Sequence, residues 1–277
     1  MIIENNKLIW DSKPYIMGIV NVTPDSFSGD GMMKNNEDFV DLCVEKALIM
    51  QEEGADIIDI GGESTRPKHI YSDTESISVD QELNRVIPVL DKLKNKLLIP
   101  ISIDTKKGIV AKFALESGAE IINDISMLED ELMIETLLKY NPKYILSHYR
   151  KTKHSRDIIN DIYLDLQEKI EVLISKNFPN ENIIVDPGIG FGKSAEQSFH
   201  IIKYLELLIK RLNKPLLIGT SKKSFLEKIT GESIENRDVG TYISNFSSLL
   251  SGADILRVHD VNNTKKIVNF YKQMRKI

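Results

Sequence analysis

The sequence predicts an α/β protein in which a short N-terminal β-hairpin precedes a (β/α)8 TIM barrel, with residues 1–277 forming a single domain. Three observations lead to this prediction. Eight short apolar segments alternate with longer amphipathic segments. One glycine-containing motif occurs three times. Polar residues follow nearly every apolar segment, and in a barrel these positions meet at one end.

The recurring motif joins the end of a helix to a strand. It reads GADIIDIGG from Gly54, GAEIINDIS from Gly118 and GADILRVHD from Gly252. Glycine at a helix C-terminus can adopt the left-handed conformation that closes the last turn. We therefore expect a helix to end at each glycine and a strand to follow, as one unit used repeatedly.

The eight expected strands are short and apolar on both faces, as in a parallel sheet covered by helices. In order they are YIMGIV before Asn21, DIIDI, LIPISI before Asp104, EIIN, KYILS before His148, NIIV before Asp186, PLLIG before Thr220 and Ser221, and DILRV. Helices are expected over residues 38–53, 79–94, 107–117, 130–140, 158–175, 198–212 and 239–251.

Three further observations complete the fold prediction. The first residues predict a hairpin that turns at Asn5-Asn6. A doubly wound open sheet is the alternative fold, but the G-x-G-x-x-G sequence typical of its first turn is missing after the first strand. No Pro-, Gly- or Ser-rich linker divides the chain, which favours one domain.

Composition limits the classes of partner. The net charge is −5 and the pI is about 5.7, so there is no global basic field of the kind that favours nucleic acid. No stretch approaches the ~20 apolar residues of a membrane span. The single cysteine, Cys43, precludes an internal disulfide and suits a reducing cytoplasm. It lies in a helical apolar pattern, which predicts a buried core residue.

The segment IIVDPGIGFGKS, residues 183–194, resembles a phosphate-binding loop but differs from it in spacing. A nucleotide P-loop has four residues between its first glycine and the G-K-S/T, whereas Gly188 and Gly192 have three between them. Pro187, one position earlier, has no N–H to donate to a phosphate. We therefore exclude ATP binding and expect a tight turn that directs Asp186 into the barrel mouth.

The residues at the strand ends suggest a small-molecule ligand. Asp104, Asn123 and Asp186 supply two acids and an amide, which suit a flat heterocycle with an amino-amidine edge. A cationic side chain is the alternative partner for a carboxylate at this position.

Cationic residues follow the second and seventh expected strands and alternate along the eighth. They are Arg66, the pair Lys222-Lys223, and the alternating Arg257 and His259. Because the loops after the seventh and eighth strands of TIM barrels often bind phosphate, their placement predicts a phosphorylated ligand.

Seven motifs in order resemble the dihydropteroate synthase family over the span from Ile16 to Val261. They are MGIVNVTPDSFS, DIGGESTRP, ISIDT, IINDIS, DPGIGFGK, GTSKKSF and RVHDV. The resemblance implies a transferase of folate biosynthesis that uses Mg²⁺. Its small-molecule substrates would be dihydropterin-methyl diphosphate and 4-aminobenzoate, and its products dihydropteroate and diphosphate. It also implies a homodimer.

The resemblance also implies the roles of site residues. As catalytic residues it implies Arg66, Lys223, Arg257 and His259. For the pterin diphosphate it implies Thr65, Asp104, Asn123, Asp186, Lys223, Arg257 and His259. For aminobenzoate it implies Phe27, Pro67, Phe191 and Ser224, and for the metal Asn21.

The chain departs from the family pattern at several places outside these positions. The first loop reads Ser28-Gly29-Asp30-Gly31, which displaces the acid by one residue. Lys68 replaces a glycine, Lys222 an arginine and Ser147 a methionine. The eighth helix, which packs the family's homodimer, has Tyr242, Ser244, Asn245 and Phe246 in an alanine-rich region.

Two other functions are compatible with the fold. A pterin-dependent methyltransferase would share the acid-amide-acid arrangement but would not need the GGESTRP loop or the RVHD motif. A degenerate paralogue would bind pterin without turnover, although Asn21, Arg66, Lys223, Arg257 and His259 all match the active family.

Overall fold

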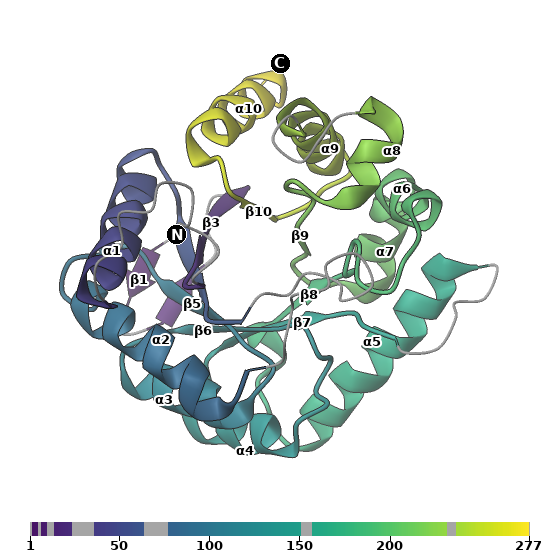
Figure 1. The fold of residues 1–277 in the computed structure, drawn as a ribbon. Helices are drawn as coiled ribbons and strands as arrows, with labels where there is room; N and C mark the ends of the chain where they lie inside the picture. Colours follow the sequence, from purple (N-terminus) through teal and green to yellow (C-terminus); the bar gives the residue numbers. More distant parts are fainter. Residues whose placement is uncertain are drawn as a thin grey trace.

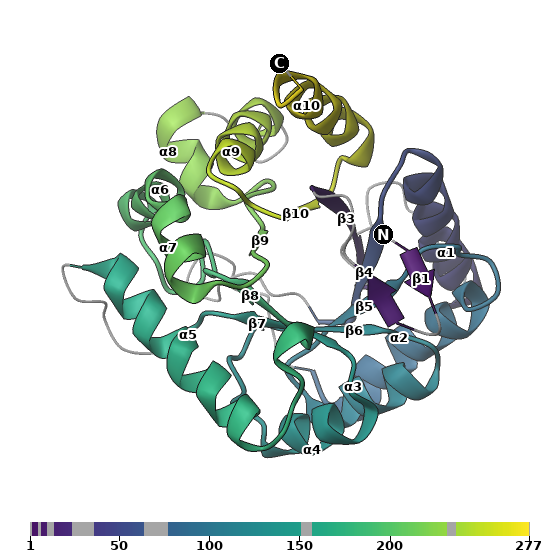
Figure 2. The same ribbon diagram turned by 180° about the vertical axis from the view of Figure 1, so that it is seen from behind.

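The central element is an eight-stranded parallel sheet surrounded by helices (Figures 1 and 2). The computed structural model describes residues 2–4, 7–9, 14–23, 36–63, 77–150, 157–231 and 237–276. The strands are β3 Tyr15–Asn21, β4 Ile57–Gly61, β5 Ile101–Asp104, β6 Ile121–Asp124, β7 Lys143–Ser147, β8 Ile183–Asp186, β9 Leu217–Ile218 and β10 Ile255–Val258. Their order is β8-β7-β6-β5-β4-β3-β10-β9.

The two edge strands of that order meet, so the sheet closes into a barrel. A parallel bridge joins Val185 of β8 to Leu216, which immediately precedes β9. The Val185 N–H also donates to the carbonyl of Pro215 at 2.9 Å. The predicted TIM barrel is therefore confirmed, and the doubly wound alternative is wrong.

The helices lie outside the barrel, and most of the predicted ones are confirmed within a few residues. They are α1 Asn36–Glu52, α2 Val79–Leu93, α3 Gly108–Glu116, α4 Glu131–Tyr140, α5 Ile158–Ser175, α6 Ala195–Lys203, α7 Leu205–Leu212, α8 Glu227–Thr230, α9 Asp238–Leu250 and α10 Val261–Met274. Among these described helices, none is long and apolar enough to cross a bilayer.

Three details of the helix prediction were wrong. The single helix expected over 198–212 is two helices, because Tyr204 leaves helical geometry at φ −109°. The first of them starts three residues earlier, where Ser194 and Gln197 form a capping box. The residues assigned to an eighth helix lie on α9, which precedes β10, whereas α10 follows the last strand and was not predicted.

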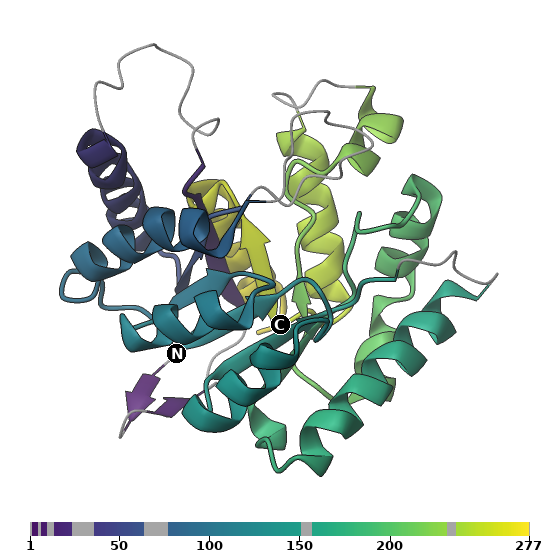
Figure 3. The same ribbon diagram turned by 60° about the horizontal axis from the view of Figure 1, so that its bottom comes forward.

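The N-terminal hairpin is confirmed. β1 Ile2–Glu4 pairs antiparallel with β2 Lys7–Ile9, with Ile2 opposite Ile9. The expected turn at Asn5-Asn6 lies outside the described residues. In Figure 3 the hairpin, in purple, lies on the opposite side of the molecule from the light-green α8.

The repeated glycines close their helices as predicted. Gly54, Gly118 and Gly252 have φ values of +99°, +106° and +98°. At each site the residue after the glycine donates its N–H to a carbonyl five residues earlier, for example from Ala55 to Met50 at 2.9 Å. This bond is typical of a Schellman cap and turns the chain directly into the next strand.

The barrel interior has an apolar layer and a polar layer above it. The apolar layer is a separate core cluster: Tyr15, Met17, Ile57, Ile121, Ile145, Ile184, Leu217 and Ile255. Side chains two residues apart on a strand share a face. The next inward positions on six of these strands are Asp59, Asn123, Ser147, Asp186, Gly219 and Arg257. The polar layer thus lies towards the carboxyl ends of the strands, where active sites of this fold are found.

The larger core cluster lies between the strands and the helices, and Cys43 belongs to it. Its side chain is fully buried, and burial raises the pKa of the thiol to about 12. The predicted structural role of Cys43 is therefore confirmed.

Candidate active site

Arg257 connects three strands of the polar layer. Its Nε donates to Asp59 Oδ2 at 2.7 Å, and its Nη2 donates to Asp104 Oδ2 at 2.6 Å. Asp59 comes from β4 and Asp104 from β5, and both carboxylates are buried. Although burial opposes the charge, the two carboxylates raise the pKa of Arg257. One guanidinium therefore holds two acids across the barrel mouth.

Among the described residues, a single guanidinium forms ion pairs with both acids, so two negative charges share one positive charge. Burial raises the pKa of Asp104 to about 7, against the opposing effect of Arg257, and the nearby Asp59 adds to the increase. A carboxylate in this state changes its protonation near neutral pH. Asp104 can thus match a ligand group by gaining or losing a proton.

Asn123 belongs to this network, and its side-chain oxygen, like one oxygen of each acid, accepts no hydrogen bond from the described residues. Its Nδ2 donates to Asp59 Oδ2 at 3.1 Å. Within the described part of the chain, Asp59 Oδ1, Asp104 Oδ1 and Asn123 Oδ1 are buried acceptors without a hydrogen-bond partner. A buried acceptor without a donor is costly. Three of them in one layer fit a ligand that presents several N–H groups.

Asp186 is the third predicted acid, and two donors hold its carboxylate. Oδ1 accepts from the Gly188 N–H at 2.8 Å, and Oδ2 accepts from Ser147 Oγ at 3.2 Å. The side chain is only 5% exposed. Asp186 therefore lies in the polar layer, as predicted from its position after the sixth barrel strand.

The glycine-rich loop after β8 is built as a tight turn. Gly188 has φ +67°, and a Cβ there would lie 2.0 Å from the carbonyl oxygen of His148. Lys193 Nζ points back into the loop and donates to the carbonyls of His148, Gly188 and Phe191 at 3.2, 2.9 and 3.1 Å. Burial lowers the pKa of Lys193 to about 7. This lysine is occupied by backbone carbonyls, which supports the exclusion of a nucleotide P-loop.

Lys223 lies between the loop after β8 and the segment after β9. Its Nζ donates to the Ile189 carbonyl and lies 4.4 Å from the centre of the Phe191 ring. Burial lowers the pKa of Lys223 to about 8, although Asp186 opposes this change. Ser224, the next residue, begins the short 3-10 helix η3 Ser224–Leu226. The structure thus brings Lys223, Phe191 and Ser224 to adjoining positions.

His259 follows β10 and is oriented by Ser221. The Ser221 Oγ lies 2.9 Å from His259 Nδ1 and accepts the His259 backbone N–H at 3.3 Å. The hydroxyl hydrogen can then point to Nδ1, which favours the tautomer protonated on Nε2. Sequence reasoning placed Ser221 at a strand end but did not find this pairing.

Asn21 ends β3 near Asp104, which ends β5 two strands away. Its Oδ1 lies 3.9 Å from the position of a Cβ built on Gly61, and Asp104 Oδ2 lies 3.8 Å from the same point. Within the described ranges, no three His, Cys, Asp or Glu side chains are grouped to hold a metal ion. Mg²⁺ commonly uses one or two protein oxygens together with substrate phosphates and water. Asn21 fits that limited role.

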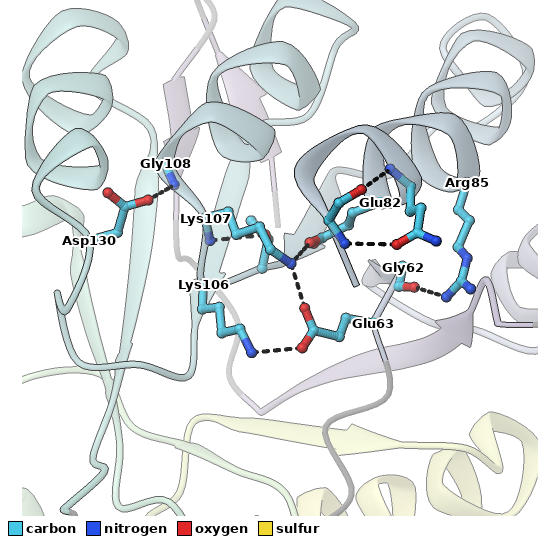
Figure 4. Close-up of polar contacts among 11 residues, drawn as sticks. Gly62, Glu63, Glu82, Arg85, Lys106, Lys107, Gly108 and Asp130 are labelled. Atoms are coloured by element: carbon cyan, nitrogen blue, oxygen red, sulfur yellow. Dashed lines mark hydrogen bonds and ion pairs between the residues drawn. The ribbon is translucent and has the colours of Figure 1, made fainter. Parts of the chain in front are cut away.

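Phe27, Thr65, Arg66 and Pro67 lie outside the described residues, as do Lys68 and residues 28–31. The chain that leads to residue 64 is tightly held, however (Figure 4). Lys107 Nζ bridges the carboxylates of Glu63 and Glu82, and Lys106 donates to Glu63 at 2.6 Å. Glu63 is the last described residue before Thr65 and Arg66, and this network holds Glu63 in place.

Three residues of the site were not predicted from the sequence: the buried Asp59 and Ser147, and the half-buried Lys193. Asp59 lies two positions after Ile57, on the same face of the strand, and this spacing was a usable signal. The inward turn of Lys193 had no sequence signal, because a lysine after a glycine loop usually faces water.

Comparison with known proteins identifies the family. The model of the pterin binding enzyme family matches residues 17–259. A dihydropteroate synthase from Clostridium beijerinckii is 41% identical over 251 residues, which cover 90% of each chain.

Two solved structures share the fold. Dihydropteroate synthase from Clostridium difficile, in the presence of pteroic acid, has a TM-score of 0.89 and 38% identity over 97% of this chain and 99% of its own. The Xanthomonas albilineans enzyme with 4-aminobenzoic acid has a TM-score of 0.89 and 34% identity over 96% and 94%. These matches span the whole barrel and leave the methyltransferase alternative without support. By sequence and by fold, this chain belongs to the dihydropteroate synthase family of pterin binding enzymes.

Proposed function

We propose that this chain condenses (7,8-dihydropterin-6-yl)methyl diphosphate with 4-aminobenzoate, giving 7,8-dihydropteroate and diphosphate. The observation that carries the proposal is the polar layer of the barrel. It combines three buried acceptor oxygens, on Asp59, Asp104 and Asn123, that have no partner in the described part of the chain with the cation Arg257. That combination suits a ligand with N–H donors on one side and a negatively charged group on the other.

Asp104, Asn123 and Asp186 bind the pterin ring in this proposal. The amino-amidine edge presents parallel N–H groups, and a carboxylate accepts such a pair in a bidentate arrangement. Asp186 is held in place by Gly188 and Ser147, so it is preorganised for that contact. Lys223 supplies a donor to the ring from the opposite loop, next to Phe191.

The diphosphate is held by Arg257 and His259, and Thr65 and Arg66, which follow Glu63 in the sequence, also contribute. Arg257 uses Nε and Nη2 for Asp59 and Asp104, and a guanidinium has five N–H donors. The remaining donors can therefore reach phosphate oxygens. His259, whose Nδ1 lies 2.9 Å from the Ser221 hydroxyl, adds a donor when its Nε2 carries a proton. Asn21 would hold Mg²⁺, and that ion would supply further stabilisation of the negative charge on the diphosphate.

The reaction exchanges one bond to the pterin methylene for another. The carbon–oxygen bond breaks, and its electrons leave with the diphosphate, whose charge Arg257 and His259 stabilise. The electron-rich ring shares the positive charge left on the methylene. The amine of 4-aminobenzoate forms the new carbon–nitrogen bond and loses its proton after attack, so no strong general base is required. Phe27, Pro67, Phe191 and Ser224 orient the aminobenzoate.

We also propose that the chain works as a cytoplasmic homodimer through the outer face of α9 and α10. Large apolar side chains on that face are exposed: Val239, Ile243, Leu250, Phe270 and Met274. Ser244 and Asn245, which depart from the family pattern, instead face inward and bond with Thr220 at 2.8 and 2.9 Å. These two departures therefore leave the outer face unchanged. Sedimentation at micromolar concentration should show a dimer that Ile243→Glu converts to a monomer.

The decisive test is diphosphate release that depends on aminobenzoate. Purified protein should release diphosphate only when both substrates are present, and removal of Mg²⁺ should reduce the rate. A degenerate paralogue would bind pterin in calorimetry yet release no diphosphate. Asp186→Ala should largely lose pterin binding, whereas Arg257→Ala should lower turnover more than pterin affinity. Unchanged pterin binding by Asp186→Ala would refute the ring assignment.

A further inference from the structure

Ser147 contacts the carboxylate that the proposed function assigns to the pterin ring. It is the last residue of β7, and its register partner on β8 is Asp186. Its Oγ donates to Asp186 Oδ2 at 3.2 Å, and its side chain is fully buried. The contact therefore lies inside the polar layer of the barrel.

The donor and the acceptor are both delivered by rigid parts of the sheet. β7 and β8 are paired from Tyr144 to Ser147, and the His148 N–H donates to the Asp186 carbonyl at 2.8 Å just beyond that pairing. The backbones on each side of the contact are thus fixed. The hydroxyl reaches the carboxylate without depending on a loop.

Two donors from different elements restrict how the carboxylate can rotate. The terminal torsion of aspartate is broad, so a single donor at Oδ1 would leave the plane of the group poorly defined. The Gly188 N–H holds Oδ1 and the Ser147 hydroxyl holds Oδ2. A carboxylate has about four acceptor sites, so each oxygen keeps capacity for a ligand.

We propose that Ser147 is a positioning residue for pterin recognition: its hydroxyl sets the plane of the Asp186 carboxylate so that both oxygens face the two parallel N–H groups of the ring edge. The inference rests on the proposed function, because it assumes that Asp186 binds the ring. It assigns to Ser147 a role in pterin affinity and none in aminobenzoate binding or in the departure of diphosphate.

Ser147→Ala in the full chain tests this role, with Ser147→Cys and Ser248→Ala beside it. Cysteine keeps the shape but is a weak donor. Ser248 is a matched control, because it is also fully buried and its hydroxyl also donates one hydrogen bond, to the Ser244 carbonyl at 2.8 Å. Calorimetry with free pterin and steady-state kinetics with both substrates are measured for each variant.

Ser147→Ala should bind pterin about tenfold more weakly, as expected for loss of one hydrogen bond to a charged group. The KM for the pterin diphosphate should rise by a similar factor, while kcat and the KM for aminobenzoate stay within about twofold of wild type. Ser147→Cys should fall between wild type and Ser147→Ala. Ser248→Ala should bind pterin as wild type does.

Two results would overturn the proposal. One is wild-type pterin affinity in Ser147→Ala; the other is a fall in kcat without a change in pterin affinity. Asp186→Ala separates this failure from failure of the proposed function. If Asp186→Ala loses pterin and Ser147→Ala does not, only the role of Ser147 is refuted. If Asp186→Ala keeps pterin, the ring assignment itself is refuted.

Discussion

Asp59 offers the sharpest test of the polar layer, through the substitution Asp59→Asn. The carboxylate is fully buried, and its Oδ2 accepts from both Arg257 Nε at 2.7 Å and Asn123 Nδ2 at 3.1 Å. An amide of the same shape removes the negative charge. It also replaces one acceptor by a donor. Arg257 then keeps only Asp104 as an anionic partner among the described residues.

The expected cost is about 3 kcal/mol in the free energy of unfolding. Removing one partner of a buried ion pair costs about 3–5 kcal/mol, and the low end applies because Arg257 retains Asp104. For a protein of this size that corresponds to a fall in Tm of roughly 6–12 °C. Because Arg257 loses an orienting contact, kcat for diphosphate release should also fall, by about tenfold.

Urea unfolding followed by circular dichroism gives the change in stability, and the release assay gives kcat. Asp56→Asn is a matched control, because Asp56 immediately precedes β4 and, among the described residues, accepts one hydrogen bond, from the Ile16 N–H at 2.8 Å. It should lose about 1 kcal/mol of stability with unchanged kcat. Wild-type stability in Asp59→Asn would refute the ion-pair reasoning. Reduced stability with unchanged kcat would show that Asp59 only supports the fold.

Three further predictions concern neighbouring residues. Lys193→Met should raise the KM for aminobenzoate several-fold, because the loop that carries Phe191 loses three contacts to the lysine, and steady-state kinetics would show it. Because the folded protein raises the pKa of Asp104 to about 7, folding favours the protonated carboxyl group. This contribution to stability should be complete below about pH 4 and be lost as the pH rises through 7. Urea midpoints at pH 5 and pH 8 should therefore differ less in Asp104→Asn than in wild type. Gly188→Ala should abolish soluble expression, since its Cβ would lie 2.0 Å from the His148 carbonyl oxygen, and wild-type yields would contradict this.

The sequence predicted the barrel because its signals are local and repeated. The glycines at 54, 118 and 252 each close a helix through their own backbone conformation, so the unit can be recognised without tertiary information. The break at Tyr204 was missed because leucine and isoleucine continue the helical pattern on both sides of it. The capping box at Ser194 was a readable local signal that marked the true start of α6.

The site was predicted less completely, because its partners are chosen by the fold. Asp104, Asn123 and Asp186 each come directly after apolar strand residues, so their position at the barrel mouth could be predicted from the sequence. The bonds of Arg257 to Asp59 and Asp104 cross the barrel, and no spacing in the sequence encodes them. The roles of all the named site residues stay predictions, as do Mg²⁺ and the single domain.

The bridge made by Arg257 has a consequence for biosynthesis of the protein. Its two acidic partners lie 198 and 153 positions earlier in the chain. During translation, therefore, Asp59 and Asp104 leave the ribosome long before the guanidinium that neutralises them. Enclosing both acids without it would leave an uncompensated internal charge. We expect the nascent polypeptide to stay open until β10 emerges, and fragments ending ahead of Arg257 to be degraded rather than to accumulate as partial barrels.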